Sequence, residues 1–307
     1  GYFLSRAFVP AQEISSGTVK IRVLEGYIDE VKFTGETTRN HIVQEIRQQI
    51  TSHAPITARQ LEHAVLLLNQ IPGQRFQTVM MPNTSESEGA GITLVLEQSE
   101  TSSNTNLSFN NHGSRFAGPA LAQFAHRDSF LPLQGTTLSG LTNMPQGNEF
   151  WSLSLRHQIR LALEIQLDLN VNGSRSDPGF TLSAVGIESE SLSWGFEFIW
   201  DAILQRRQNL QLSWGFDYSD TNTDILNVPI TRDRIRALHT GLEYNGQDPF
   251  SGIHLVDFEL RRGLKGIGAN DEDDILLSRA QADPDFTAGR VTWRYRRPVL
   301  QDFTLAT

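Results

Sequence analysis

Hydrophobic and polar residues alternate with a period of two through most of the chain beyond residue 104, most clearly between Leu161 and Val171. Every second residue there is leucine, isoleucine or valine, and the residues between them include Glu164 and Asp168. This pattern predicts a strand with one apolar and one polar face. Its 11 residues match the roughly 9–11 residues of a tilted membrane strand, whereas soluble strands average about 5–6.

Similar faces recur along the last two hundred residues, with serine, glycine and charged residues opposite them. The apolar positions are Trp151, Leu153 and Leu155; Leu192, Trp194, Phe196, Phe198 and Trp200; Leu210, Leu212, Trp214, Phe216 and Tyr218; and Val291, Trp293 and Tyr295. Roughly ten or eleven strands fit between residues 104 and 307, at about 19 residues for a strand and its connection. The pattern is typical of a water-filled membrane barrel, although a soluble β-sandwich also alternates. Short polar links such as 205–209 and longer loops at 222–231 and 266–285 are expected between the strands.

The first hundred residues predict a small α+β unit instead. A half-buried strand is expected at Val19, Ile21 and Val23. After it the pattern predicts a strand over 27–33, a helix with apolar residues at 42, 43, 46 and 50, and a second helix that begins with a Thr57–Gln60 capping box. Two more strands follow, at 74–81 and 92–96. A right-handed crossover places strand 27–33 beside strand 92–96 and leaves strand 74–81 at the edge of the sheet. A polar linker at 98–104 separates this unit from the alternating region.

Composition narrows the function classes. The 307 residues contain no cysteine, which excludes disulfides, thiolate zinc sites and iron–sulfur clusters. The net charge of −9 argues against a dedicated nucleic-acid binder. The longest apolar stretch, 64–68, has five residues, where a spanning helix needs about 20. The chain starts at Gly1 without a signal peptide pattern and stops at Thr307 in an extended-looking segment, so a fragment is expected.

Motifs that carry chemistry are weak throughout the sequence. The acidic run 271–274 lacks the alternate spacing of a calcium loop and is interpreted as a solvated loop. Gly263, Gly266 and Gly268 are followed by no strand-to-helix pattern that would make a phosphate cradle. The eight histidines show no paired metal spacing, and no nucleophile–base pair is evident. No catalytic residue, metal, cofactor or nucleotide is therefore expected, and the chain is not expected to be an enzyme.

Several phrases of sequence occur in an order that resembles one family, the outer-membrane transporters of two-partner secretion (ShlB/FhaC/HecB-like haemolysin secretion/activation proteins). The phrases are Val9-Pro10-Ala11-Gln12, Ile14-Ser15-Ser16-Gly17, residues 19–28, Leu66-Leu67-Leu68-Asn69-Gln70-Ile71-Pro72-Gly73, residues 111–118, Gln208-Asn209-Leu210 with residues 214–218, and Asp285-Phe286-Thr287. The resemblance implies that residues 1–25 end a first POTRA domain, 26–98 form a second, and 104–307 form the N-terminal part of a porin-like transmembrane β-barrel. About 10–11 of the family's sixteen strands would be present. The family's Val-Arg-Gly pore-loop motif would then follow Thr307.

The function implied by the resemblance is protein secretion across the outer membrane of a Gram-negative bacterium. Periplasmic POTRA domains would recognise a large secreted exoprotein by its N-terminal secretion domain, and the barrel, embedded in outer-membrane lipid, would export it. Two alternatives stay open at this point. One is an outer-membrane barrel assembly factor of the same superfamily, and the other is a soluble all-β binding or hydrolytic protein.

Two sets of residues are candidates for these functions, one for binding the exoprotein and one for lining the pore. An edge strand offers unpaired backbone groups to an extended partner, although solvent or a neighbouring POTRA domain would also cap it. The candidate partner-binding residues are Arg75, Phe76, Gln77, Thr78, Val79 and Met80. Charged residues on the polar faces of barrel strands would line the pore, although solvation of strand ends also accounts for the arginines. The candidate lumen residues are Glu164, Asp168, Glu197, Asp217, Arg290, Arg294 and Arg296.

Overall fold

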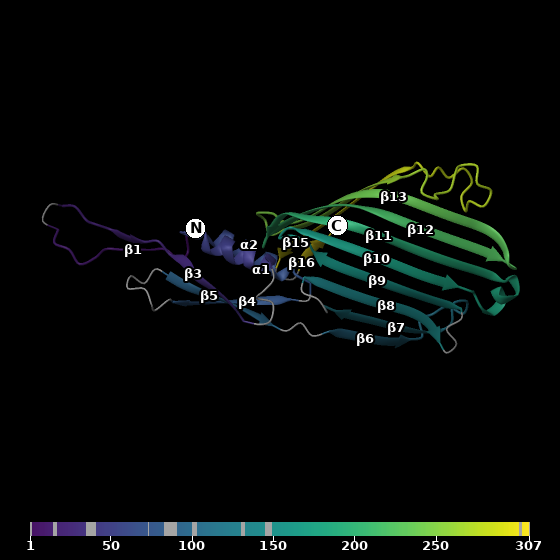
Figure 1. The fold of residues 1–307 in the computed structure, drawn as a ribbon, viewed down its shortest axis with the longest axis horizontal. Helices are drawn as coiled ribbons and strands as arrows, with labels where there is room; N and C mark the ends of the chain where they lie inside the picture. Colours follow the sequence, from purple (N-terminus) through teal and green to yellow (C-terminus); the bar gives the residue numbers. More distant parts are fainter. Residues whose placement is uncertain are drawn as a thin grey trace. The chain divides into compact units, whose positions relative to one another are not determined.

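The computed structural model describes residues 2–14, 17–34, 41–72, 74–82, 91–99, 103–129, 133–144, 149–300 and 303–306 (Figure 1). The chain divides into two compact units. Residues 1–101 with 204–206 form the first, and residues 102–203 with 207–307 form the second. No helix among the described residues has both the length and the apolar character needed to cross a membrane.

The first unit contains a three-stranded sheet and two helices (Figure 1). Its elements are β3 (Tyr27–Thr34), α1 (His41–Thr51), α2 (Ala58–Asn69), β4 (Arg75–Pro82) and β5 (Gly91–Ser99). The strand order is β3-β5-β4, with β3 parallel and β4 antiparallel to β5. Strand β4 thus lies at an edge, as the crossover argument predicts, and β3 lies at the other edge.

Amphipathic periodicity explains both helices. Helix α1 buries its four apolar residues at 42, 43, 46 and 50. At the start of α2, the Thr57 hydroxyl accepts the Gln60 N–H at 3.2 Å while the Gln60 side chain accepts the Thr57 N–H at 2.8 Å. This is the predicted capping box. The buried faces of the helices and the strand residues Ile28, Leu94 and Leu96 form the core of the unit.

The segment before β3 departs from the prediction. Strand β2 (Arg22–Leu24) has three residues and pairs with β1 (Arg6–Phe8) in an isolated antiparallel pair. Val19, Ile21 and Val23 are exposed rather than half-buried. The reason is that the described residues place no further layer against this two-stranded ribbon, and a ribbon alone cannot bury a face.

The second unit is an antiparallel sheet of eleven strands, each paired with its neighbours in sequence (Figure 1). Its strands are β6 (Asn104–Asn110), β7 (Ala120–Asp128), β8 (Gln134–Met144), β9 (Phe150–Arg160), β10 (Ile165–Ser176), β11 (Ile187–Gln205), β12 (Gln208–Ile225), β13 (Val228–Gln247), β14 (Ile253–Gly263), β15 (Thr287–Leu300) and β16 (Phe303–Ala306). A 3₁₀ helix, η2 (Phe180–Val185), lies between β10 and β11. Among the described strands, β6 and β16 are the free edges and do not pair with each other.

One predicted loop is instead part of a long hairpin. Strands β12 and β13 continue through residues 222–231 and meet in a two-residue turn, in which Leu226 and Asn227 have φ of 50° and 61°. Two positive φ values are typical of the tight turns that suit twisted strands. The polar composition suggested a loop, but side chains of this segment form hydrogen bonds across strands, as between Thr223 and Ser189 at 3.2 Å. The other predicted long loop is present between β14 and β15.

Candidate functional site

The edge strand β4 exposes most of its side chains. Phe76 is buried, whereas Val79, Met80 and Met81 are exposed, and every residue of the strand except Phe76 is open to solvent. Strand β5 covers one side of β4, with Thr78 opposite Leu96 and Met80 opposite Leu94. The six candidate partner-binding residues 75–80 therefore lie together on one edge of the sheet.

A side chain from the end of α2 shows which backbone groups of β4 point away from β5. The Asn69 carbonyl oxygen accepts the Phe76 N–H at 2.9 Å, and its amide group donates to the Phe76 carbonyl oxygen at 3.3 Å. In an antiparallel strand the N–H and C=O of one residue point to the same side, and this side alternates from residue to residue. The backbone groups of Thr78 and Met80 therefore point to the open edge, and those of Gln77 and Val79 point to β5.

Cross-strand register sorts the large sheet into two faces, because directly paired residues point to the same side. Ile165 pairs with Trp200 and Leu167 with Phe198, which gives a face of aliphatic and aromatic side chains, here called the apolar face. Asp168 pairs with Glu197 on the opposite face, here called the charged face. Aromatic rings also meet across strands on the apolar face, where Trp194 stacks on Tyr218 at 5.1 Å between centroids.

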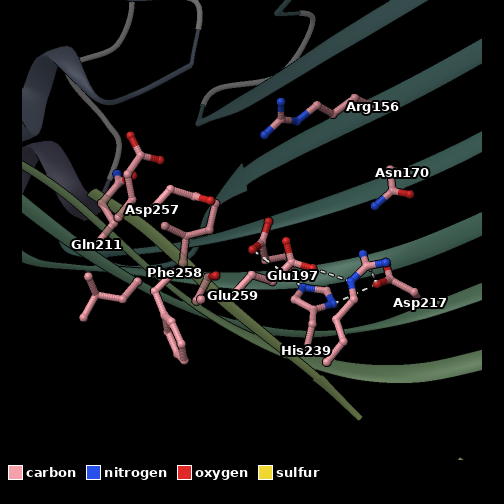
Figure 2. Close-up of a pocket in the computed structure, with 15 residues that line it drawn as sticks. Arg156, Asn170, Glu197, Gln211, Asp217, His239, Asp257, Phe258 and Glu259 are labelled. Atoms are coloured by element: carbon pink, nitrogen blue, oxygen red, sulfur yellow. Dashed lines mark hydrogen bonds and ion pairs between the residues drawn. The ribbon is translucent and has the colours of Figure 1, made fainter. Parts of the chain in front are cut away.

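On the charged face, His239 of β13 lies between two carboxylates, Asp217 of β12 and Glu197 of β11 (Figure 2). Its Nδ1 is 3.0 Å from Asp217 Oδ2 and its Nε2 is 3.7 Å from Glu197 Oε1. Arg261 donates to Asp217 at 2.8 Å and also contacts Glu259. A cavity of about 400 Å³ opens beside these residues. Two of the predicted lumen residues, Glu197 and Asp217, are thus part of one charged network across β11–β14.

Strand β15 extends this network. Arg290 donates to Glu259 at 2.7 Å and lies 3.7 Å from Asp257. Arg294 lines a neighbouring cavity of about 350 Å³, and Arg296 is exposed on the same face. Glu164 lies apart from this network, in the turn before β10, where it accepts a hydrogen bond from Trp200 at 3.4 Å.

Asp168 forms a second group with residues of β9 and β10. It is nearly fully buried and accepts hydrogen bonds from Arg156 Nε at 3.0 Å and from Gln166 at 2.6 Å. Nearby, Arg160 and Asp201 form an ion pair at 2.8 Å, with side chains only 2% and 1% exposed. Sequence reasoning missed this buried pair because its partners are 41 residues apart. The available signal was that Arg160 and Asp201 directly flank the predicted strand positions Leu161 and Trp200.

Glycine makes room for the His239 ring. Gly215 lies directly opposite His239, and a Cβ at Gly215 would lie 2.2 Å from the Phe196 carbonyl oxygen and 2.7 Å from the imidazole. Both distances are shorter than contacts allow, so the histidine occupies the space that a side chain would fill. The sequence analysis treated His239 as one of several scattered histidines, because only the strand register brings it between two carboxylates.

The charged face carries paired charges on neighbouring strands. Carboxylates, guanidinium groups and an imidazole alternate across neighbouring strands, and most are held by a partner of opposite charge. No group of three or more histidine or acidic side chains among the described residues is arranged to hold a metal ion. The arrangement can form hydrogen bonds with polar groups and attract or repel charged ones.

The comparisons with known proteins agree with this architecture. Residues 1–26 match the family model described as POTRA domain, ShlB-type. The structure of CdiB from Escherichia coli superposes with a TM-score of 0.73 at 15% identity, over 98% of this chain and 56% of that one. CdiB from Acinetobacter baumannii gives a TM-score of 0.63 at 11% identity, over 99% and 55%. No curated protein matches the chain by sequence.

The match of residues 1–26 to the ShlB-type POTRA model agrees with the predicted family resemblance for that segment, and membership of the whole chain in the transporter family stays a prediction. The predicted fold class, an α+β POTRA module followed by an antiparallel sheet of the barrel type, is confirmed, with eleven strands in the sheet. The chain spans about half the length of the CdiB structures. Which charged residues face a pore and which edge binds a partner stay predictions.

Proposed function

We propose that this chain belongs to an outer-membrane translocator that binds a secreted exoprotein through its POTRA unit and exports it through a β-barrel pore. The observation that carries the proposal is the combination, in one chain, of a ShlB-type POTRA match and a CdiB-like sheet with one apolar and one charged face. An apolar exterior around a charged interior is the arrangement of a water-filled membrane barrel.

The apolar face has the height that a bilayer requires. On β11 its residues run from Leu192 to Ala202, which is about 33 Å along the strand and about 25 Å in height at a tilt of about 40°. Trp194 and Trp200 lie within this band near its two ends. Tryptophan is enriched at membrane interfaces, where its ring meets both apolar and polar surroundings. We therefore place the apolar face toward lipid and the charged face toward the pore.

The pore wall is expected to bind a passing polypeptide weakly. Asp217 and Glu197 alternate with His239, Arg261 and Arg290, so an exported segment of either charge meets attraction and repulsion within a few residues. A pore wall with charges of only one sign would retain exported segments of the opposite charge. Paired charges keep the wall hydrated without creating such a strong field.

On the POTRA side, we propose that β4 recruits the exoprotein by strand addition. The outward N–H groups of Thr78 and Met80 and the exposed side chains of Val79 and Met80 offer hydrogen bonds and apolar contact to an extended segment. The proposed function does not depend on this detail, because another surface of the POTRA unit could bind the exoprotein while the barrel exports it.

The proposal is tested by secretion from cells that carry the full-length protein and the exoprotein encoded beside it. Removal of the full-length protein should leave the exoprotein inside the cell and leave the amounts of other outer-membrane barrels unchanged. A general loss of outer-membrane barrels would instead identify an assembly factor. Normal release of the exoprotein would contradict the translocator function.

A further inference from the structure

The apolar face ends abruptly on β13, and arginine follows. From the turn at residue 248, β13 can be followed backward along the chain toward the turn at Leu226. Its residues on the apolar face include first Leu242 and Leu238 and then Arg236, Arg234 and Arg232. The neighbouring strand β12 changes in the same way, because Tyr218 is followed on this face by Asp220 and Asn222. These three residues pair with Arg236, Arg234 and Arg232, respectively. A polar border thus crosses both strands at one height.

Arg236 is fixed at this border. Its side chain is only 2% exposed, and its guanidinium lies 3.4 Å from the centroid of the Tyr218 ring. It donates to Asp220 at 2.7 Å and to the Ser219 and Ile267 carbonyl oxygens at 3.1 and 3.2 Å. Because these groups satisfy Arg236, it anchors the upper part of β13 and holds the two arginines above it in place.

Arg232 and Arg234 differ from Arg236 in their exposure and in their ion-pair partners. Both are exposed, and no carboxylate among the described residues lies within 4.0 Å of either guanidinium. Arg175 gives a direct comparison, because it faces the same way in the same cross-strand row. Arg175 pairs with Glu190 of β11. The next residue of β11, Ser191, is hydrogen-bonded to Thr221 of β12, which places Glu190 opposite Asn222. Asn222 in turn pairs with Arg232 of β13. Arg175 is neutralised by Glu188 at 3.0 Å and Glu190 at 3.2 Å.

The height of Arg234 matches a lipid headgroup layer, and Arg232 lies just above it. Arg234 and Arg232 lie two and four residues beyond Arg236, which is about 5 and 10 Å above the apolar border at a tilt of about 40°. The polar layer on each side of a bilayer is about 5–8 Å thick. Guanidinium groups bind phosphate through paired, charge-assisted hydrogen bonds.

We propose that Arg232 and Arg234 bind a phosphate group of the phosphorylated glycolipid in the outer leaflet of the membrane. This inference rests on the proposed outer-membrane placement of the sheet. It adds a lipid ligand on the outer surface, separate from the pore and from the partner edge.

The test uses the full-length protein folded in lipid nanodiscs and bisphosphorylated lipid A as the added ligand. Binding is measured by native mass spectrometry, and thermal stability by the gel shift of the folded barrel. The double variant Arg232→Gln/Arg234→Gln should bind lipid A at least about tenfold more weakly and lose the thermal stabilisation that lipid A gives the unmodified protein. Arg175→Gln is the matched control and should behave like the unmodified protein, because its charge is already paired.

Two further ligands identify the source of the phosphate. Lipid A without its phosphates should bind the unmodified protein as weakly as the double variant binds lipid A, and inorganic phosphate at millimolar concentration should not displace lipid A. Equal binding by the double variant, equal binding of dephosphorylated lipid, or displacement by free phosphate would each overturn the inference. A protein that never gives the gel shift of a folded barrel would contradict the outer-membrane placement itself, and the inference with it.

Discussion

The side chain of Asn69, at the end of α2, holds both backbone hydrogen-bonding groups of Phe76, the second residue of the edge strand β4. This contact occupies the outward backbone groups of Phe76, so they are not available to a partner strand. It also shows to which side the backbone N–H and C=O groups of the following residues point. Thr78 and Met80 present their backbone groups to the open edge, whereas Gln77 and Val79 bond to β5. The edge available to a partner therefore begins at Thr78.

Thr78→Pro should weaken exoprotein binding without unfolding the POTRA unit. Proline removes an N–H that points away from the sheet, so the hydrogen bonds between β4 and β5 remain, but an added strand loses a donor. We expect binding of the exoprotein's secretion domain to fall by about fivefold to tenfold, from the loss of about 1 kcal/mol. Isothermal titration with the full-length protein measures the affinity, and circular dichroism checks the fold.

Gln77→Pro is the control for this substitution. It removes an N–H directed at Glu97 of β5 and should destabilise the sheet by about 3 kcal/mol or more. If Thr78→Pro folds normally and binds the exoprotein as tightly as the unmodified protein, β4 is not the docking site. If both variants fold poorly, the edge is not open.

Ile165→Arg tests the orientation of the large sheet in the membrane. Ile165 lies on the apolar face opposite Trp200, near one end of the apolar band, so a charge there would face lipid and cost about 1 kcal/mol, below the roughly 2–4 kcal/mol expected at the bilayer midplane. The neighbouring variant Gln166→Arg places the same charge on the charged face and should cost much less. Refolding titrations in lipid vesicles measure both, and equal destabilisation would contradict the assignment of the faces.

The two faces were predictable from sequence because alternation along a strand is a local property. The positions of Asp168, Glu197 and Asp217 on the polar side follow from their place in each strand alone. The contacts between them do not, because they depend on register. His239 reaches Asp217 only through the pairing of β12 with β13 and the space left by Gly215.

The first unit shows the same division. The capping box at Thr57 and the apolar stripe of α1 are encoded within a few residues, and both were predicted. The direction of the free backbone groups on β4 required the Asn69 contact, and the exposure of Ile21 required knowing that no layer among the described residues covers β2. The long hairpin at Leu226 was missed because polar residues that bond across strands have the composition of a loop.

Arg160→Met should strongly destabilise the large sheet. It would leave the Asp201 carboxylate buried with Gln211 as its remaining donor, at 2.7 Å, and breaking a buried ion pair on one side costs about 3–5 kcal/mol. The double variant Arg160→Met/Asp201→Leu should recover most of this loss, since neither charge is then left without a partner. Urea unfolding in lipid vesicles measures both. A double variant less stable than the single variant would contradict this account.

Asp248 should make the turn between β13 and β14 sensitive to acid. Burial opposes its ionisation, but the N–H groups of Gly252 and Phe250 donate to the carboxylate at 2.7 and 2.8 Å and hold its pKa below the ordinary value. A lowered pKa stabilises the folded turn above the unfolded pKa, and this contribution is lost as the pH falls through the folded value. The turn should therefore stay ordered at pH 5 and loosen below about pH 4.

Hydrogen exchange at the Phe250 and Gly252 amides measures this change. Protection should fall as the pH drops below about 4, after correction for the intrinsic exchange rate. Asp248→Asn should show weaker protection at neutral pH and no further acid-dependent loss. Protection that stays constant down to pH 2 would contradict the assigned role of the carboxylate.

Asp217→Asn should change the ion selectivity of the pore. Asp217 accepts hydrogen bonds from His239 and Arg261, so the amide would remove the counter-charge of Arg261 from the charged face. The wall becomes more positive, and the reversal potential of the full-length protein in planar bilayers should shift toward anions. Asp283→Asn is the control, since Asp283 lies in the loop between β14 and β15, 3.7 Å from Lys265, and should leave the reversal potential unchanged. An equal shift from both variants would show a general effect of net charge. If Asp217→Asn forms a conducting pore whose reversal potential is unchanged, the placement of Asp217 in the pore wall is wrong.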